Sequence, residues 1–179
     1  KLKNIAKNNI LCDNVDAEKM AIQQALPEKD GAVEKSLYQN FDKALGLPED
    51  AIQFLMDIWA AIKLFDDVAD ADDISRVDLD RVIWSLLVGI HANLFFEAKK
   101  HALLPVLATA ILKWQASDAV ERSGKADARS YVWRAGFYDL VLIVVQLCHG
   151  VDVATKLSPV VMNMYGENLE DYIKEFDNA

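Results

Sequence analysis

Apolar residues recur along the chain at spacings of three and four, the period of an amphipathic α-helix. Alternating apolar and polar runs bounded by turns, which are typical of β-strands, are absent from the sequence. We therefore expect an all-α, single-domain bundle of about six to eight helices. The predicted helices are 15–26, 31–45, 49–68, 78–92, 94–103, 105–122, 126–149 and 158–176.

Prolines and glycines mark several of the expected boundaries. Pro48 and the acids after it suit a helix start, where backbone N–H groups lack partners. Gly124 is expected to end a helix, and Ser158 to cap the next one with Pro159 at its first position. Pro105 lacks a capping residue before it, so it either starts a helix or kinks one long helix.

The segment 126–149 is apolar nearly all round in its second half, as expected for a helix surrounded by others. We expect it at the centre of the bundle. One stripe of this helix carries small and polar residues, namely Ala128, Ala135, Gly136, Asp139 and Gln146. The small residues would allow a neighbouring helix to approach closely, and the two polar ones would interrupt an apolar seam.

A chain of 179 residues fits one domain with a substantial core. Residues 1–30 are the most polar, so we expect a polar N-terminal arm or a loosely packed helix there and the bundle domain over 31–179. The densest apolar stretch, AGFYDLVLIVVQLC, is too short and too polar to span a membrane. No signal peptide is recognisable, and a cytoplasmic location without membrane contact is the expectation.

The sequence is acidic, with 28 acidic and 19 basic residues and a net charge of −9. This charge repels a phosphate backbone, and no basic patch offsets it, so nucleic-acid binding is not expected. Cys12 and Cys148 lie far apart without further metal-ligand pairs, which indicates neither a disulfide framework nor a zinc site.

Seven aspartates occur in KLFDDVADADDISRVDLD, residues 63–80. Four of them precede or open the next helix, where capping explains them: Asp72, Asp73, Asp78 and Asp80. Asp66, Asp67 and Asp70 remain as candidates for a divalent-cation site. On a helical wheel Asp66 borders the apolar arc, whereas Asp67 and Asp70 lie on the polar arc, where Lys63 and Asp67 can pair.

Other acidic residues favour ion pairing. Asp118 and Glu121 are interleaved with basic residues, as at a solvated helix end. Asp139 has apolar neighbours and needs a partner, for which Arg134, Arg129, Arg122 and Lys113 are available. Asp139 is a candidate catalytic acid if a pocket opens beside it, and otherwise a structural ion pair.

The remaining chemistry-bearing residues indicate no site. The three histidines have no metal-binding spacing, and no serine or cysteine has a histidine nearby for nucleophilic catalysis. Trp59, Trp84, Trp114 and Trp133 fall at helical core spacing and are expected to pack in the core.

The segment FDDVAD, residues 65–70, resembles the first aspartate-rich motif of all-α isoprenoid synthases, in particular the squalene and phytoene synthase group. That resemblance implies carboxylates that hold Mg²⁺, which in turn binds a diphosphate. Such a site needs a second carboxylate set on a facing helix. The late candidates Asn163, Glu167 and Glu170 lie opposite the apolar arc of their predicted helix and should face solvent.

Two longer stretches, LMDIWAAIKLFDDVADADD and ILKWQASDAVERSGKADARSYVWRAGFYDLVLIVVQLCHG, resemble uncharacterised proteins encoded in bacteriophages and prophages. The resemblance spans roughly residues 47–176 and implies a bacterial or viral cytosolic setting. It assigns no activity and no functional residues.

These patterns favour a non-enzymatic helical protein that interacts with a protein partner or with itself as a small oligomer, without a cofactor. The alternative is a Mg²⁺-dependent enzyme acting on a phosphorylated or diphosphorylated small molecule. In that reading Asp66 and Asp70 are ligands and Asp139 is the opposing acid.

Overall fold

The computed structural model describes residues 28–177 and divides the chain into two compact units, Lys1–Asn40 and Phe41–Ala179. In the first unit the described part is helix α2 (Glu28–Gln39), which continues into the π-helical turn η1 (Asn40–Ala44). The helix expected at 15–26 lies outside the described residues, as does almost all of the expected arm.

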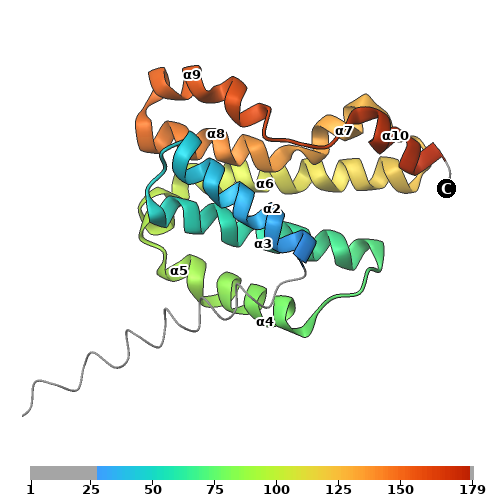
Figure 1. Ribbon diagram of the computed structural model, residues 1–179, viewed down its shortest axis with the longest axis horizontal. Helices are drawn as coiled ribbons and strands as arrows, with labels where there is room; N and C mark the ends of the chain where they lie inside the picture. The colour runs from blue at the N-terminus through green and yellow to red at the C-terminus, as the bar shows by residue number, and fades with distance from the viewer. Residues whose placement is uncertain (1–27, 178–179) are drawn as a thin grey trace, which may run out of the picture. The chain divides into compact units, whose positions relative to one another are not determined.

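The second unit is a layered helical bundle (Figure 1). Its helical segments are α3 (Glu49–Asp70), α4 (Arg76–Trp84), η2 (Ser85–Gly89), α5 (Ile90–Ala92), α6 (Leu94–Arg122), α7 (Ala128–Arg134), α8 (Gly136–His149), α9 (Val151–Met162) and α10 (Leu169–Asp177). Helix α3 packs against α4 and η2 on one side and against α6 and α8 on the other, while α9 covers α8. The described residues contain no strand, which confirms the all-α prediction.

The core of this unit is built on α3, α6 and α8. Phe54 of α3 stacks on Phe96 of α6, with ring centroids 5.5 Å apart. Helix α8 contributes fully buried aliphatic side chains: Leu140, Val141, Val144 and Val145. Its second half is therefore central, as expected. A Cβ atom on Gly136 would lie 3.2 Å from the Ala110 backbone, so the small residue does allow α6 to approach closely.

Four predicted helices differ from the observed ones: 94–103 and 105–122 are joined, 126–149 is divided, and 158–176 is misplaced. Pro105 lies inside one continuous helix, α6, which settles the alternative that was left open. The predicted helix 126–149 is interrupted at Ala135, between α7 and α8. The prediction for 158–176 is wrong: Pro159 lies inside α9, and Ser158 donates to the Thr155 carbonyl instead of capping a helix.

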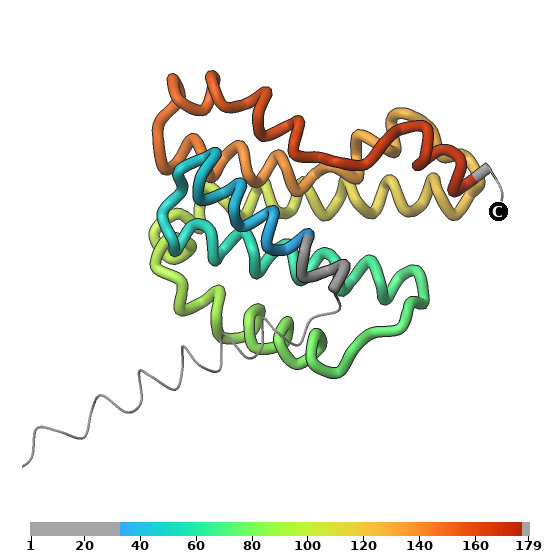
Figure 2. The backbone as a smooth tube through the Cα atoms, in the orientation of Figure 1, coloured from blue at the N-terminus to red at the C-terminus, as the bar shows by residue number. Residues whose placement is uncertain are grey.

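The segment from Arg76 to Ala92 forms one helical rod, in which η2 is a π-helical insertion between α4 and α5. It begins at Ser75, whose hydroxyl accepts the Asp78 N–H at 3.0 Å. Figure 2 traces this rod in green along α3. The rod packs on α3 through Leu79, Val82 and Leu86. The side chains on the opposite side of the rod are exposed, so no described helix of the second unit covers that side.

No single helix of the described part of the chain is long and apolar enough to cross a membrane. Two pairs of consecutive helices meet the length and composition together but are bent by 95° and 45°.

Candidate functional site

Asp66, the aspartate at the border of the predicted core, is held by an arginine and a tryptophan side chain. Both of its carboxylate oxygens contact the Arg134 guanidinium, at 3.0 and 3.1 Å. The Trp114 indole N–H also donates to Asp66, at 3.1 Å. Helices α3, α6 and α7 therefore meet at one charged group, and a metal ion there would have to compete with the Arg134 guanidinium.

Arg134 connects Asp66 to a second carboxylate, Glu121. Its other terminal nitrogen lies 2.7 Å from Glu121, whose side chain is only 6% exposed. The Ser117 hydroxyl lies 2.7 Å from Glu121, and the Tyr172 hydroxyl donates to the same oxygen at 2.6 Å. The predicted ion pairing of Glu121 and Asp118 is confirmed, the latter with Arg122 at the surface, but the prediction that Glu121 lies at a solvated helix end was wrong.

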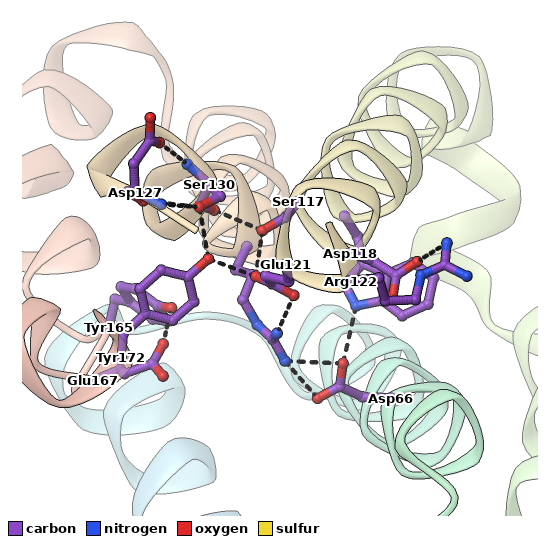
Figure 3. A network of polar contacts seen from close by, with 12 residues as sticks. Asp66, Ser117, Asp118, Glu121, Arg122, Asp127, Ser130, Tyr165, Glu167 and Tyr172 are labelled. Carbon is purple, nitrogen blue, oxygen red and sulfur yellow. Dashed lines mark hydrogen bonds and ion pairs between the residues drawn. The ribbon is translucent and has the colours of Figure 1, made fainter. Parts of the chain in front are cut away.

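Figure 3 shows how these side chains converge from four helices. Helix α7 begins with a capping box, in which Asp127 accepts the backbone N–H of Ser130 and the Ser130 hydroxyl accepts the N–H of Asp127. This box buries Ser130 next to the Tyr172 hydroxyl, 2.7 Å away. We call the group connected by these contacts the Arg134 network; it consists of Asp66, Trp114, Ser117, Glu121, Ser130, Arg134 and Tyr172.

The Arg134 network has the properties of a structural cluster. Burial raises the pKa of Tyr172, and the hydrogen bond to Glu121 adds to this, so its hydroxyl stays protonated as a donor. Polar groups taken out of water must find partners, and here each carboxylate is met by a donor from another helix. The arrangement fixes α7 and α10 against α3 and α6.

The other metal candidates do not join Asp66 in a cluster. Asp67 pairs with Lys63 at 3.5 Å, as the spacing predicted. Asp70 is exposed, and the partial desolvation of its carboxyl, together with the charge of Asp66, raises its pKa. Asn163, Glu167 and Glu170 are exposed, as expected. Among the residues the structure describes, no three His, Cys, Asp or Glu side chains are grouped to hold a metal ion. The Mg²⁺ site stays a prediction.

Asp139 pairs with Lys113 of α6, their charged atoms 2.5 Å apart, and not with one of the candidate arginines. It is partly exposed, so the seam around it is less apolar than expected. An open groove of about 410 Å³ lies beside it between α8 and α9. Its lining holds no second acid; the two hydroxyls in it, of Thr155 and Ser158, donate to backbone carbonyls of α9, and Asp139 itself is paired with Lys113.

Asp57 is a buried carboxylate that sequence reasoning missed. It is 8% exposed and accepts hydrogen bonds from Gln53, at 3.0 Å, and from Ser85, at 2.9 Å. Burial raises its pKa, and the two hydrogen bonds oppose that rise only in part. Because Ser85 opens η2, Asp57 anchors the π-helical insertion to α3. Such insertions occur frequently at functional sites.

The rod from Arg76 to Ala92 carries a row of large apolar side chains on the side away from α3. We call it the apolar face; it consists of Val77, Ile83, Trp84, Leu87 and Val88. Trp84 is 68% exposed and Leu87 is 70% exposed. The prediction that Trp84 packs in the core was therefore wrong. Ile83 and Leu87, like Trp84 and Val88, lie one turn apart, so their side chains form two adjacent rows.

Sequence reasoning could have found part of the Arg134 network and of the apolar face. The wheel already placed Asp66 at the edge of the core, which indicates a partner. Trp84 and Val77 are seven residues apart and share a helix face, but that period does not distinguish a core face from an unpartnered one. Glu121 and Tyr172 are 51 residues apart, and no local pattern links them.

Compared with known proteins, the chain matches no family model, no curated protein and no solved structure.

Proposed function

We propose that the protein is a helical interaction module that binds another protein chain through the apolar face of α4 and η2. The observation that carries this proposal is the exposure of Trp84 among four aliphatic neighbours on one side of a helix. Large contiguous apolar patches are uncommon on monomeric proteins and mark interaction sites. Tryptophan is also enriched among the residues that dominate binding energy at protein interfaces.

The construction of the rod supports this role. None of the residues of η2 is buried, so Leu87 and Val88 contribute little to the core. Asp57 nevertheless holds the insertion in place through Ser85, although burying a carboxylate costs free energy. A costly buried group that positions an exposed apolar surface is better explained by use of that surface than by stability.

The enzyme alternative has less support. Asp66 is paired with Arg134 and Asp139 with Lys113, so a divalent cation would have to compete with a basic side chain at either carboxylate. The polar groups that converge most closely, in the Arg134 network, bind one another. An interaction protein requires none of these carboxylates to be free.

The test is site-specific photo-crosslinking of the full chain in the cells that express it. A photoreactive phenylalanine analogue replaces Trp84 in one variant and Leu112 of α6 in a matched control, since Leu112 is similarly exposed, at 65%, but lies outside the apolar face. We expect a discrete adduct to a protein, identified by mass spectrometry, from position 84 and none from position 112. No adduct at position 84, or equal adducts at both positions, would refute the proposal.

A further inference from the structure

We propose that the rod from Arg76 to Ala92 separates from α3 as one unit while the other helices of the second unit stay folded. Asp57 of α3, which is buried beneath the rod, sets how often this happens. The proposal concerns the motion of the rod and holds whether or not the apolar face binds a partner. Separation would uncover the side chains by which the rod packs on α3 and so add a second apolar surface to the apolar face.

Both ends of the rod are breaks between helices. Before its start, residues 71–75 are not helical, and Ala71 has a φ of 62°, a left-handed conformation that is unfavourable for a residue with a side chain. After its end, Asn93 has an extended backbone, and the helix axis turns by 95° into α6. The Asn93 side chain donates to the Asp50 carbonyl at 2.7 Å, which ties this end to the start of α3. The rod can therefore turn about Asn93 while residues 71–75 follow its movement.

The contact between the rod and α3 is small. Of the described residues of the rod, only Val82 and Ile90 are buried. Val82 packs on Ala61 and Leu64 of α3 in a small apolar cluster. Helix α3 itself has nine buried residues among its 22. Elements with few buried apolar contacts open at a lower free energy than the core, so the rod is expected to open before the rest of the bundle unfolds.

Asp57 lies beneath both ends of η2. Its Oδ1 atom accepts the Ser85 hydroxyl at 2.9 Å, and its Oδ2 atom is 3.7 Å from the position of a Cβ atom on Gly89. Ser85 is the first residue of η2 and Gly89 the last. Because these two residues lie over the Asp57 carboxyl, separation of the rod would return this carboxyl to water.

Proton binding to Asp57 should therefore favour the closed rod. Asp57 is faced by the neutral side chains of Gln53 from α3 and Ser85 from η2, and by the charge of Arg81 from α4, which itself pairs with Asp78 at 3.1 Å. Burial raises the pKa of Asp57 above its ordinary value of 3.8, and these three groups oppose that rise only in part. The closed rod thus binds the proton more tightly than the open one, and a rising pH shifts the balance towards the open rod.

Thiol labelling of the full chain tests the motion, in a background with Cys12→Ser and Cys148→Ala. Val82→Cys places a thiol between the rod and α3, and Val144→Cys is the matched control, because Val144 is fully buried in α8. We expect dithiodipyridine to label Val82→Cys at least about tenfold faster than Val144→Cys, since the first thiol needs only the rod to open and the second needs global unfolding. Equal rates would overturn the proposal.

Two further substitutions separate opening of the rod from global unfolding. Ser85→Ala removes a hydrogen bond that only the closed rod makes, and it should speed the labelling of Val82→Cys about tenfold. Arg134→Met weakens contacts that persist when the rod is open, so it should speed the labelling of Val144→Cys and leave that of Val82→Cys unchanged. Faster labelling of both thiols in Arg134→Met would show that the rod leaves α3 only when the whole bundle unfolds.

The role of Asp57 is tested by the pH dependence of the same labelling. The rate for Val82→Cys, divided by the rate for the urea-unfolded chain at the same pH, should rise from about pH 4 to about pH 7 and stay level in Asp57→Asn. A fall with rising pH, or an equal rise in Asp57→Asn, would show that Asp57 does not control the rod.

Amide hydrogen exchange of the unsubstituted chain repeats the comparison without a new thiol, and it decides the question if Val82→Cys is not folded by circular dichroism. The amides of residues 80–86 should exchange through one opening of lower free energy than those of residues 141–145 in α8. The same free energy for both segments would again overturn the proposal. None of these results depends on a partner, so the crosslinking from position 84 tests the proposed function separately.

Discussion

Arg134 brings one positive charge to two carboxylates from different helices, Asp66 and Glu121. The Glu121 side chain is almost inaccessible to water, so removing its cation leaves a buried charge without compensation. We expect Arg134→Met to lower the free energy of unfolding by about 3 kcal/mol or more. Urea denaturation followed by circular dichroism measures this loss.

Arg122→Met is the matched control, because Arg122 is 73% exposed and pairs with Asp118 at the surface, where such pairs are worth about 1 kcal/mol or less. Adding Glu121→Gln to Arg134→Met removes the unpaired charge and should restore much of the loss. Equal effects of the two arginine substitutions would show that the Arg134 network contributes no more than a surface ion pair.

The buried carboxyl of Asp57 should make the free energy of unfolding decrease as the pH rises. Burial raises its pKa in the folded chain above the ordinary value of 3.8, so the unfolded chain ionises it more readily. Its favourable contribution is therefore present below pH 3.8 and is lost as the pH rises through the raised pKa. We expect Asp57→Asn to become more stable relative to the parent chain as the pH increases towards 7.

Urea unfolding of both chains at a series of pH values gives this difference directly. The amide oxygen of an asparagine can still accept the Ser85 hydrogen bond, so the two chains differ mainly in whether residue 57 can ionise. A difference that favours the parent chain more strongly at higher pH would contradict the assignment of Asp57 as a carboxylate held in an unfavourable environment.

At the scale of the helix, Tyr172 attaches α10 to the rest of the bundle through polar contacts. Tyr172 is 1% exposed and reaches Glu121 and Ser130 from α10, which packs against α7. A hydrogen bond to a charged group contributes about 1.5–3 kcal/mol. Tyr172→Phe should therefore increase local opening of α10 roughly tenfold or more.

Amide hydrogen exchange over residues 169–176 measures this opening, and the amides of Val141, Val144 and Val145 in α8 are the internal control, because their side chains are fully buried in the core. A uniform increase in both segments would mean that Tyr172 acts on global stability, and no increase in either would mean that packing alone holds α10.

The helices differ in how far the sequence predicts them. Helix α3 follows from Pro48, the acids after it and a regular apolar arc, all of them local features. The break at Ala135 lies beside Gly136, which α6 approaches closely, and α6 continues through Pro105 with buried side chains on both sides of it; neither feature has a local sequence signal. For the candidate sites, the border position of Asp66 was predicted because a helical wheel indicates burial. Glu121 and Trp84 were assigned to the wrong environments, because the charge or apolarity of a side chain does not reveal which helix lies opposite it.

At the scale of the whole molecule, the excess of acidic residues is distributed over several ion pairs and capping positions rather than collected at one point. Asp66, Asp67, Asp118 and Asp139 each have a basic partner on the bundle. We therefore expect Mg²⁺ to leave the thermal midpoint of unfolding unchanged within about 1 °C when ionic strength is held constant with NaCl.

The size of the effect makes this measurement decisive. A site that binds only the folded chain adds about 2.7 kcal/mol when the free ion is at 100 times its dissociation constant. For a chain of this length that corresponds to a rise of roughly 5–10 °C in the midpoint. A rise of this size that disappears in Asp66→Asn or Asp70→Asn would restore the metal-dependent alternative, because Mg²⁺ would then have displaced Arg134 from Asp66. A smaller rise that survives both substitutions would indicate diffuse attraction of the cation to an acidic surface.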